Sequence, residues 1–392
     1  MLRPRLRLKI LHAAKFYAPV RGGMETVLAD LCEGTATEWD VQVVAANDAP
    51  QSAAERRGDV DVVRAAAFGQ AASVPLCPTL PWQLWTHPAD CVVLHEPNPI
   101  AGTALWLRLP ARRLIIWHHS DLVRPWWAPP TYGRIVQRSL YERADCVIVS
   151  SPALASESPL VRRARHVAVI PFGVALERYR RTDADRAAAI EAVRARTRGP
   201  RLLFVGRLVY YKGVHVLLEA ARDWPGTLIV VGDGPLEGEL RARAARLGIA
   251  DRVQFAGALT DDEVEAHYQA CDALVLPSVA RTEAFGVVQV EAMAAGLPVV
   301  STQLPTGVPW VNQDGVSGIV VPPDDASALG AALRRLAHDS ALRASLGEGA
   351  RRRADTLFAR ERMVRAFKEV VETVVRAPER LGEHLADLAR AV

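Results

Sequence analysis

The sequence Pro277–Val300, PSVARTEAFGVVQVEAMAAGLPVV, joins a strand end, a glycine loop and a helix start, and it carries two carboxylates. The apolar run Ala273–Leu276 in front of it is typical of a buried strand. Glu283 lies in the loop, and Gly286 lets a ligand approach the backbone closely. Glu291 lies one to two turns inside the helix that follows. A helix start offers unpaired N–H groups, so this segment predicts an anion site flanked by two acidic side chains.

Length and composition indicate a globular protein of two domains. The chain has 392 residues, half of them hydrophobic and 23% charged, which is enough for two sizeable cores. Its five cysteines are scattered and include no C-x-x-C pair, so we expect a reducing, cytoplasmic compartment without a disulfide framework. No apolar run approaches the roughly 18 residues of a membrane-spanning helix.

The net charge is +4, and the surplus of basic residues falls in the first 175 residues. This weak excess favours an acidic substrate, or contact with the anionic inner face of a membrane. It is too small to indicate nucleic acid, and no nucleic-acid-binding motif is present.

Two further segments predict phosphate contacts. Gly22 and Gly23 stand between the strand-like run Arg7–Ala13 and a helix, where exposed amides can cradle a phosphate. Gly206 ends the strand-like run Arg201–Val205, and two cations follow it in a loop. Arg207 and Lys212 are five positions apart, so both could converge on a diphosphate.

Strand-like runs alternate with helical segments along the first half, which favours a doubly wound α/β domain. The runs are Val41–Ala45, Val60–Ala65, Cys91–His95, Leu114–His118, Cys146–Ser150 and Val167–Gly173. Ligands in such folds bind at the carboxyl ends of the strands. Two polar clusters stand at such ends: His95 begins one, and His118-His119-Ser120-Asp121 forms the other.

Taken together, these motifs resemble the GT4 family of retaining glycosyltransferases. The carboxylate pair resembles its E-x7-E element, Gly206-Arg207 with Lys212-Gly213 its G-R…K-G element, and His119-Ser120-Asp121 its H-S-D element. The resemblance implies an α/β GT-B fold with two Rossmann-like, doubly wound domains that face a cleft. We expect an acceptor-side domain over 1–174 and a nucleotide-sugar domain over 175–376. A long helix over 351–375 would precede a tail, 377–392, that crosses back onto the first domain.

The resemblance also implies roles for single residues. Catalytic roles would fall to His119, Arg207, Lys212 and Glu283. Donor binding would involve Gly22, Gly23, Gly206, Phe285, Gly286, Val287 and Glu291. The cations would neutralise the leaving diphosphate, so no metal cofactor is expected. The D-x-D spellings at Asp59 and Asp183 are interpreted as a chance match before a strand and as a helix cap.

The acceptor side is predicted from weaker signals. We expect His95, Asp121, Trp126 and Trp127 to contact the acceptor. Tryptophans beside prolines suit a boundary that is apolar on one side and wet on the other, which favours a peripheral membrane contact. The alternative is that these tryptophans close the edge of the domain.

The resemblance implies transfer of a hexose from GDP-mannose or a UDP-hexose to a glycan or a polyprenyl-diphosphate-linked acceptor, in polysaccharide biosynthesis. Two alternatives stay open. One is a GT-B sugar-nucleotide epimerase, which needs no acceptor. The other is a non-catalytic nucleotide-sugar-binding subunit, which would bind the donor and transfer nothing.

Overall fold

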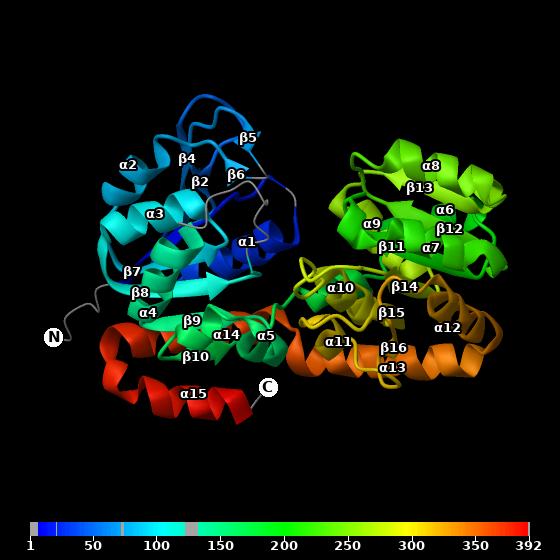
Figure 1. Ribbon diagram of the computed structural model, residues 1–392. Helices are drawn as coiled ribbons and strands as arrows, with labels where there is room; N and C mark the ends of the chain where they lie inside the picture. Colours follow the sequence, from blue (N-terminus) through cyan, green and yellow to red (C-terminus); the bar gives the residue numbers. More distant parts are fainter. Residues whose placement is uncertain (1–6, 21, 72–73, 122–131, 391–392) are drawn as a thin grey trace. The chain divides into compact units, whose positions relative to one another are not determined.

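The computed structural model describes residues 7–20, 22–71, 74–121 and 132–390 (Figure 1). The chain forms two compact units. Unit 1 comprises Met1–Phe172 with Arg360–Val392, and unit 2 comprises Gly173–Ala359. Each unit is built on a mainly parallel sheet whose strands alternate with helices, so the predicted pair of Rossmann-like domains is confirmed.

Unit 1 has an eight-stranded sheet in the order β10-β9-β8-β7-β1-β2-β4-β3, and only β3 runs antiparallel to its neighbour. The strands are β1 Lys9–Ala13, β2 Asp40–Ala46, β3 Ala53–Arg57, β4 Val60–Ala65, β7 Ala89–Glu96, β8 Ala111–His118, β9 Cys146–Val149 and β10 Val167–Val169. A two-stranded ribbon, β5 Gln70–Ala71 and β6 Val74–Pro75, lies outside this sheet. Every strand predicted in this half is present, and β3, β5 and β6 were not predicted.

The connections of unit 1 are short helices. They are α1 Gly23–Ala36, α2 Leu80–Trp85, α3 Pro99–Leu107, a π-helical turn at Tyr132–Gln137, α4 Arg138–Arg143 and α5 Pro152–Glu157. Two C-terminal helices, α14 Arg360–Arg376 and α15 Leu381–Arg390, complete the unit. The Asp59 carboxylate pairs with Arg56 across the β3–β4 turn, which supports a structural role for the first D-x-D spelling.

The predicted helix over 351–375 was wrong, and the boundary at 376 lies too late. The chain breaks at Phe358, whose carbonyl accepts a hydrogen bond from the amide of Val174. Helix α13 (Ser340–Leu357) therefore stays in unit 2, whereas α14 packs in unit 1. Phe367 explains this packing, because it is fully buried against Trp39 and Trp117.

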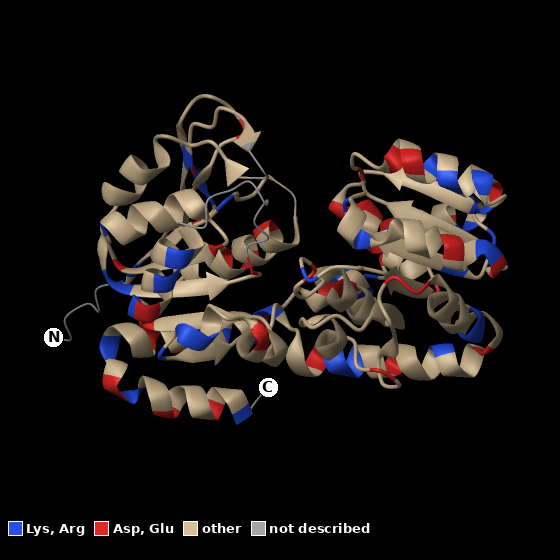
Figure 2. Ribbon diagram, in the orientation of Figure 1, with Lys and Arg blue, Asp and Glu red and all other residues tan. Residues whose placement is uncertain are grey.

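Unit 2 has a six-stranded parallel sheet in the order β13-β12-β11-β14-β15-β16. Its strands are β11 Arg201–Val205, β12 Thr227–Val231, β13 Val253–Gly257, β14 Ala273–Leu276, β15 Val299–Thr302 and β16 Gly318–Val321. Its α-helices are α6 Ala184–Ala195, α7 Val214–Ala220, α8 Glu237–Arg246, α9 Asp261–Ala270, α10 Val287–Ala295, α11 Val308–Val311, α12 Ala326–His338 and α13. Asp183 caps α6 through the amide of Arg186, as predicted. Helices α8 and α13 carry charges of both signs, whereas the strands are nearly uncharged (Figure 2).

The strand order reverses once in each sheet. In unit 1 the chain proceeds from β1 to β2 on one side and later adds β7 on the other. In unit 2 it proceeds from β11 to β12 and later adds β14. Loops leave the carboxyl ends of the two central strands in opposite directions at such a point, and the space between them is where ligands bind in open α/β sheets.

Candidate active site

In unit 2, two loops meet between the carboxyl ends of β11 and β14. Backbone groups join them, since the amide of Val279 donates to the carbonyl of Tyr211 at 2.8 Å. Gly213 makes this approach feasible: it has φ 69°, and a Cβ there would lie 1.9 Å from the carbonyl oxygen of Pro277. The contact places Lys212, the residue before this glycine, against the loop that carries Glu283.

Lys212 and Glu283 form the central pair of this site. The Nζ of Lys212 lies 2.5 Å from Oε2 of Glu283, which also accepts a hydrogen bond from Ser278 at 3.1 Å. Burial by itself would lower the pKa of Lys212, but the neighbouring Glu283 carboxylate leaves that pKa above its ordinary value. The ammonium group is therefore kept charged in a largely buried position, where its field is screened less than in water.

Arg207 lies on the same loop without joining this pair. Its side chain is exposed, and it forms no hydrogen bond or ion pair with any of the residues that the structure describes. Burial raises the pKa of Tyr211, and the charges of both Lys212 and Arg207 act to lower it. Both cations therefore act on one tyrosine, and Arg207 is exposed on a loop that begins at Gly206 with φ 152°.

The second predicted carboxylate has different partners. Glu291 of α10 accepts a hydrogen bond of 2.6 Å from the hydroxyl of Tyr268, and Tyr179 also donates to it. Burial raises the pKa of the Glu291 carboxyl, and the two tyrosines oppose that rise. Its charge also acts on Lys212, so the carboxylates share one region while each is held by its own partners. Tyr179, Tyr268 and Ser278 were not predicted from the sequence.

The glycine loop of this segment has the predicted geometry. Gly286 precedes α10 with φ 72°, and a Cβ there would lie 2.6 Å from the side chain of Leu276. Val287 is the first residue of the helix. The side chain of Phe285 is buried against Trp310 and Phe358. Only its backbone can face a ligand.

In unit 1, the paired glycines begin α1. Gly22 precedes the helix in an extended conformation and Gly23 is its first residue. The carboxylate of Glu25 folds back over this turn, because a Cβ on Gly22 would lie 2.1 Å from its Oε2. Burial raises the pKa of Glu25. A side chain at position 22 would displace this carboxylate from the helix start.

Three histidines meet at the strand reversal of unit 1. His95 in β7 lies between His12 of β1 and His119, which directly follows β8; its ring nitrogens are 3.0 Å from a ring nitrogen of each. His95 was predicted on the acceptor side, but its partner is the catalytic candidate His119. The sequence did carry one signal for this cluster, since each histidine stands at or near the end of a buried strand.

Asp121 lies beside His118, and not beside His119 of its own H-S-D element. Its Oδ1 accepts a hydrogen bond of 2.7 Å from Ser158 and lies 3.5 Å from Nε2 of His118. His118 in turn contacts the hydroxyl of Tyr141 at 2.5 Å. The remaining acceptor-side candidates, Trp126 and Trp127, lie outside the described residues.

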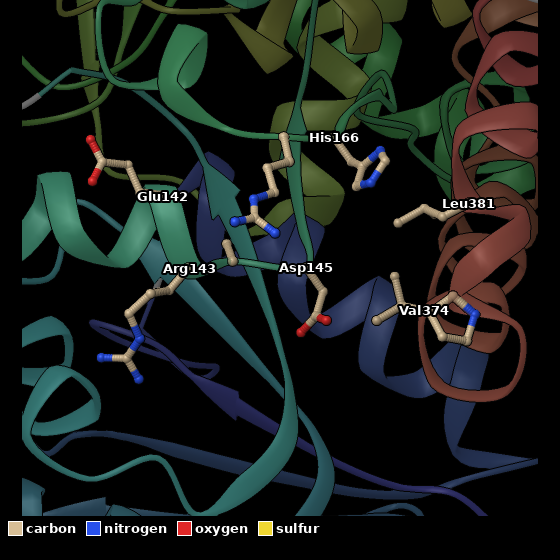
Figure 3. A pocket seen from close by; sticks show the side chains of 9 residues that line it. Glu142, Arg143, Asp145, His166, Val374 and Leu381 are labelled. Atoms are coloured by element: carbon tan, nitrogen blue, oxygen red, sulfur yellow. The ribbon is translucent and has the colours of Figure 1, made fainter.

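Two cavities lie elsewhere in the described part of unit 1. One of about 320 Å³ is lined by the residues before β9 and β10, with α14 and α15 opposite (Figure 3). These residues mark the amino ends of the strands, away from the reversal of strand order. Asp145 there is already bound by Arg113 and the amide of Leu114, which explains it structurally.

Neither a metal site nor a membrane-spanning helix is found in the part of the chain that the structure describes. Within it, no group of three or more His, Cys, Asp or Glu side chains could hold a metal ion. None of the described helices combines the length and the apolar character needed to cross a bilayer.

Known proteins with similar sequences are glycosyltransferases. Residues 22–173 match the family described as glycosyl transferase 4-like domain, and residues 185–353 match glycosyl transferases group 1. Over 378 residues the chain is 32% identical to O-antigen chain mannosyltransferase C from Escherichia coli, covering 94% of this chain and 99% of that protein. It is also 32% identical to the D-rhamnosyltransferase WbpZ from Pseudomonas aeruginosa, over 90% of this chain and 92% of that one.

Solved structures agree on the fold. A sucrose-phosphate synthase from Thermosynechococcus elongatus covers 95% of this chain with all of its own, at a TM-score of 0.79 and 23% identity. WaaG, a glycosyltransferase involved in lipopolysaccharide biosynthesis, covers 94% with a TM-score of 0.70 and 20% identity. These likenesses confirm the predicted GT-B fold class.

Proposed function

Because this chain belongs to the group 1 glycosyltransferases with a GT4-like N-terminal domain, we propose that it is a retaining, metal-independent hexosyltransferase. The proposed donor is GDP-mannose, with a UDP-hexose as second candidate. The proposed acceptor is a growing surface polysaccharide linked to a polyprenyl diphosphate. The two relatives at 32% identity are named as a mannosyltransferase and a rhamnosyltransferase, which supports a hexose or deoxyhexose and favours mannose.

One observation carries the proposal: the Lys212–Glu283 pair lies at the strand reversal of unit 2. Charge accumulates on the diphosphate when the bond to the sugar breaks. A cation that is already fixed near the departing diphosphate oxygen stabilises that charge, and no protein group has to move for it to do so. Lys212 supplies the fixed cation in our proposal, and Arg207 folds in from solvent to add a second one. Two protein cations can do here what a bound divalent metal does elsewhere.

The other groups position the substrates. Glu283 would exchange part of its contact with Lys212 for sugar hydroxyls, and Glu291 would hold the ribose. The amides at Gly22, Gly23, Gly286 and Val287 would contact phosphate oxygens. His119 would bind the donor sugar near the bond that breaks. Retention would then follow from attack on the face that the diphosphate leaves, with a phosphate oxygen taking the proton of the acceptor hydroxyl.

We place the reaction in the cytoplasm at the inner face of the membrane, where a polyprenyl-linked acceptor is anchored. All five cysteines are buried and unpaired, which suits a reducing compartment. The acceptor-side residues would include Asp121 and the segment that contains Trp126 and Trp127.

The test is a transfer assay with the full chain. Radiolabelled GDP-mannose and UDP-hexoses are offered with and without a polyprenyl-diphosphate-linked oligosaccharide, and both the labelled product and the released nucleotide are measured. We expect transfer from one donor only when the acceptor is present, with the anomeric configuration retained. Turnover of donor without acceptor would indicate an epimerase. Donor binding without transfer to any acceptor offered would indicate a non-catalytic subunit.

A further inference from the structure

The three histidines at the strand reversal of unit 1 form one hydrogen-bonded row. Nδ1 of His12 contacts Nε2 of His95, and Nδ1 of His95 contacts Nε2 of His119, each at 3.0 Å. The rings of His95 and His119 are nearly parallel, with 13° between their planes. We call this row the imidazole chain.

The imidazole chain is enclosed by aromatic side chains. Trp117 stacks on His95 and His119, Phe172 lies beside His119, and Phe367 of α14 lies against His12. His12 is fully buried, and His119 is 7% exposed. His12 is therefore closed off from solvent, whereas a small part of the His119 side chain other than its buried Nδ1 is exposed.

Both terminal nitrogens lack a partner among the described residues. They are Nε2 of His12 and Nδ1 of His119, and both atoms are buried. Nearby carboxylates are bound elsewhere: Glu96 accepts from Tyr132 and Gln137, and Asp121 from Ser158. A histidine tautomer is usually set by a carboxylate or another partner of the ring. Here the tautomers are set by the hydrogen bonds between the histidines of the imidazole chain.

Proton counting allows two arrangements. A neutral imidazole has one N–H and one lone pair, so each ring that donates through one nitrogen must accept through the other. Both links therefore point the same way. Either every proton is on Nδ1, with the free N–H at His119, or every proton is on Nε2, with the free N–H at His12.

Burial chooses between the two. An N–H group without a partner is the costlier orphan in a protein interior. At His12 nothing described can accept it, and that side chain is fully buried. Nδ1 of His119 is buried as well, but His119 is 7% exposed and directly follows β8, at the carboxyl end of the sheet where ligands bind in such folds, so its N–H is the one placed to meet a ligand oxygen. We propose that His12 and His95 are positioning residues that fix the proton of His119 on Nδ1, so that His119 offers a hydrogen-bond donor to an acceptor oxygen of the nucleotide sugar.

This assignment rests on the proposed function only for the identity of the ligand. The chain needs neutral rings, and burial supplies them: it lowers the pKa of His12 and of His119 to about 3, and that of His95 well below its ordinary value. A neutral donor suits a sugar hydroxyl or ring oxygen. It also leaves the charge stabilisation of the diphosphate to the cations of unit 2.

The experiment reads the tautomers directly. The full chain is produced with ¹⁵N-labelled histidine, and two-bond ¹⁵N–¹H correlation spectra identify the protonated nitrogen of each ring. We expect protonated Nδ1 in His12, His95 and His119. Protonation of His119 on Nε2 would overturn the proposal, whether or not any variant folds.

Two variants add the link to activity. His95→Phe keeps a ring and removes both hydrogen bonds, so His119 should populate both tautomers and transfer from GDP-mannose should fall roughly 10- to 100-fold. His166→Phe is the matched control, because His166 lies in the same unit but is not part of the imidazole chain. We expect it to change neither the His119 tautomer nor the rate of transfer. An unaltered His119 spectrum in folded His95→Phe would also contradict the proposal. If the tautomers behave as expected while the wild type transfers no sugar, the proposed function is wrong, but the role of the imidazole chain in fixing the His119 tautomer is still supported.

Discussion

The two units place polar side chains at the same point of similar sheets, beside the carboxyl end of the central strand, but they use opposite chemistry. Unit 1 places neutral imidazoles there, beside β1 and β7. Unit 2 places an ion pair there, Lys212 with Glu283, beside β11 and β14. Equivalent positions in one fold class are therefore equivalent in geometry only.

Burial explains the contrast. An isolated charge is costly inside a protein, so a buried ionisable group either finds an opposite charge or loses its own. Lys212 follows the first course, and its pKa stays raised because Glu283 is adjacent. The histidines follow the second, and their pKa values fall. Unit 2 can therefore stabilise developing charge, whereas unit 1 can orient neutral groups.

The largest test of this contrast removes the cation. Lys212→Met keeps the aliphatic part of the side chain and deletes the ammonium group, so transfer should fall by about 10²–10³. The same change leaves the nearly buried Glu283 unpaired, which should also reduce the free energy of unfolding. Transfer rates with saturating donor and urea unfolding measure the two effects.

The matched control separates those effects. Glu283→Gln combined with Lys212→Met removes the unpaired charge, so most of the lost stability should return. Transfer should stay low because the cation is still missing. Recovery of transfer in the double variant would mean that Lys212 acts only by satisfying Glu283.

The second test breaks the loop contact that creates the ion pair. Gly213→Ala places a Cβ against the carbonyl of Pro277, and Gly248→Ala places one in open space at nearly the same φ, 68° against 69°. Both pay for a left-handed backbone, but only Gly213→Ala adds a clash. We expect it to lower the free energy of unfolding by about 2–3 kcal/mol more than Gly248→Ala. Equal losses in urea unfolding would show that the loops can separate freely.

The sequence was sufficient for the sheets because buried parallel strands have continuous apolar runs. Their order of appearance, alternating with helices, leaves few topologies. It missed β3 because Ala53–Arg57 is exposed along its whole length and carries no apolar pattern. It misplaced α14 because the break at Phe358 contains no glycine or proline. That break comes from a backbone pairing with Val174, which is distant in sequence.

For the candidate site, single residues were predictable from the sequence, but their partners were not. Motif spacing singled out Lys212, Glu283 and His119 individually as candidates. The partners of each side chain come from register between strands that are far apart in sequence. Register places His95 beside both His12 and His119, and puts Asp121 beside His118. No local pattern encodes these pairings.

The smallest effect tests the neutral side of the contrast through pH. Folded His12, His95 and His119 stay unprotonated well below pH 6.5, whereas the unfolded chain takes up their protons near that pH. The unfolded state then binds more protons, so stability falls as pH drops from about 6.5 toward the folded pKa values, by up to about 1.4 kcal/mol per pH unit for each histidine. Glu25, Glu96 and Glu291 act in the opposite direction, because burial raises their pKa values.

A difference between variants isolates the histidine contribution. His12→Phe should reduce the slope of unfolding free energy against pH by about 1.4 kcal/mol per unit between pH 6 and 4.5, roughly the range between the two pKa values. Leu11→Ala, equally buried on β1, should lower stability by a similar amount at every pH and leave the slope unchanged. Hydrogen exchange of the β1 and β7 amides reports on unit 1 specifically. If the slope of unfolding free energy against pH is the same in His12→Phe as in the wild type, the imidazole chain is protonated in the folded state. The contrast with the charged site of unit 2 would then disappear.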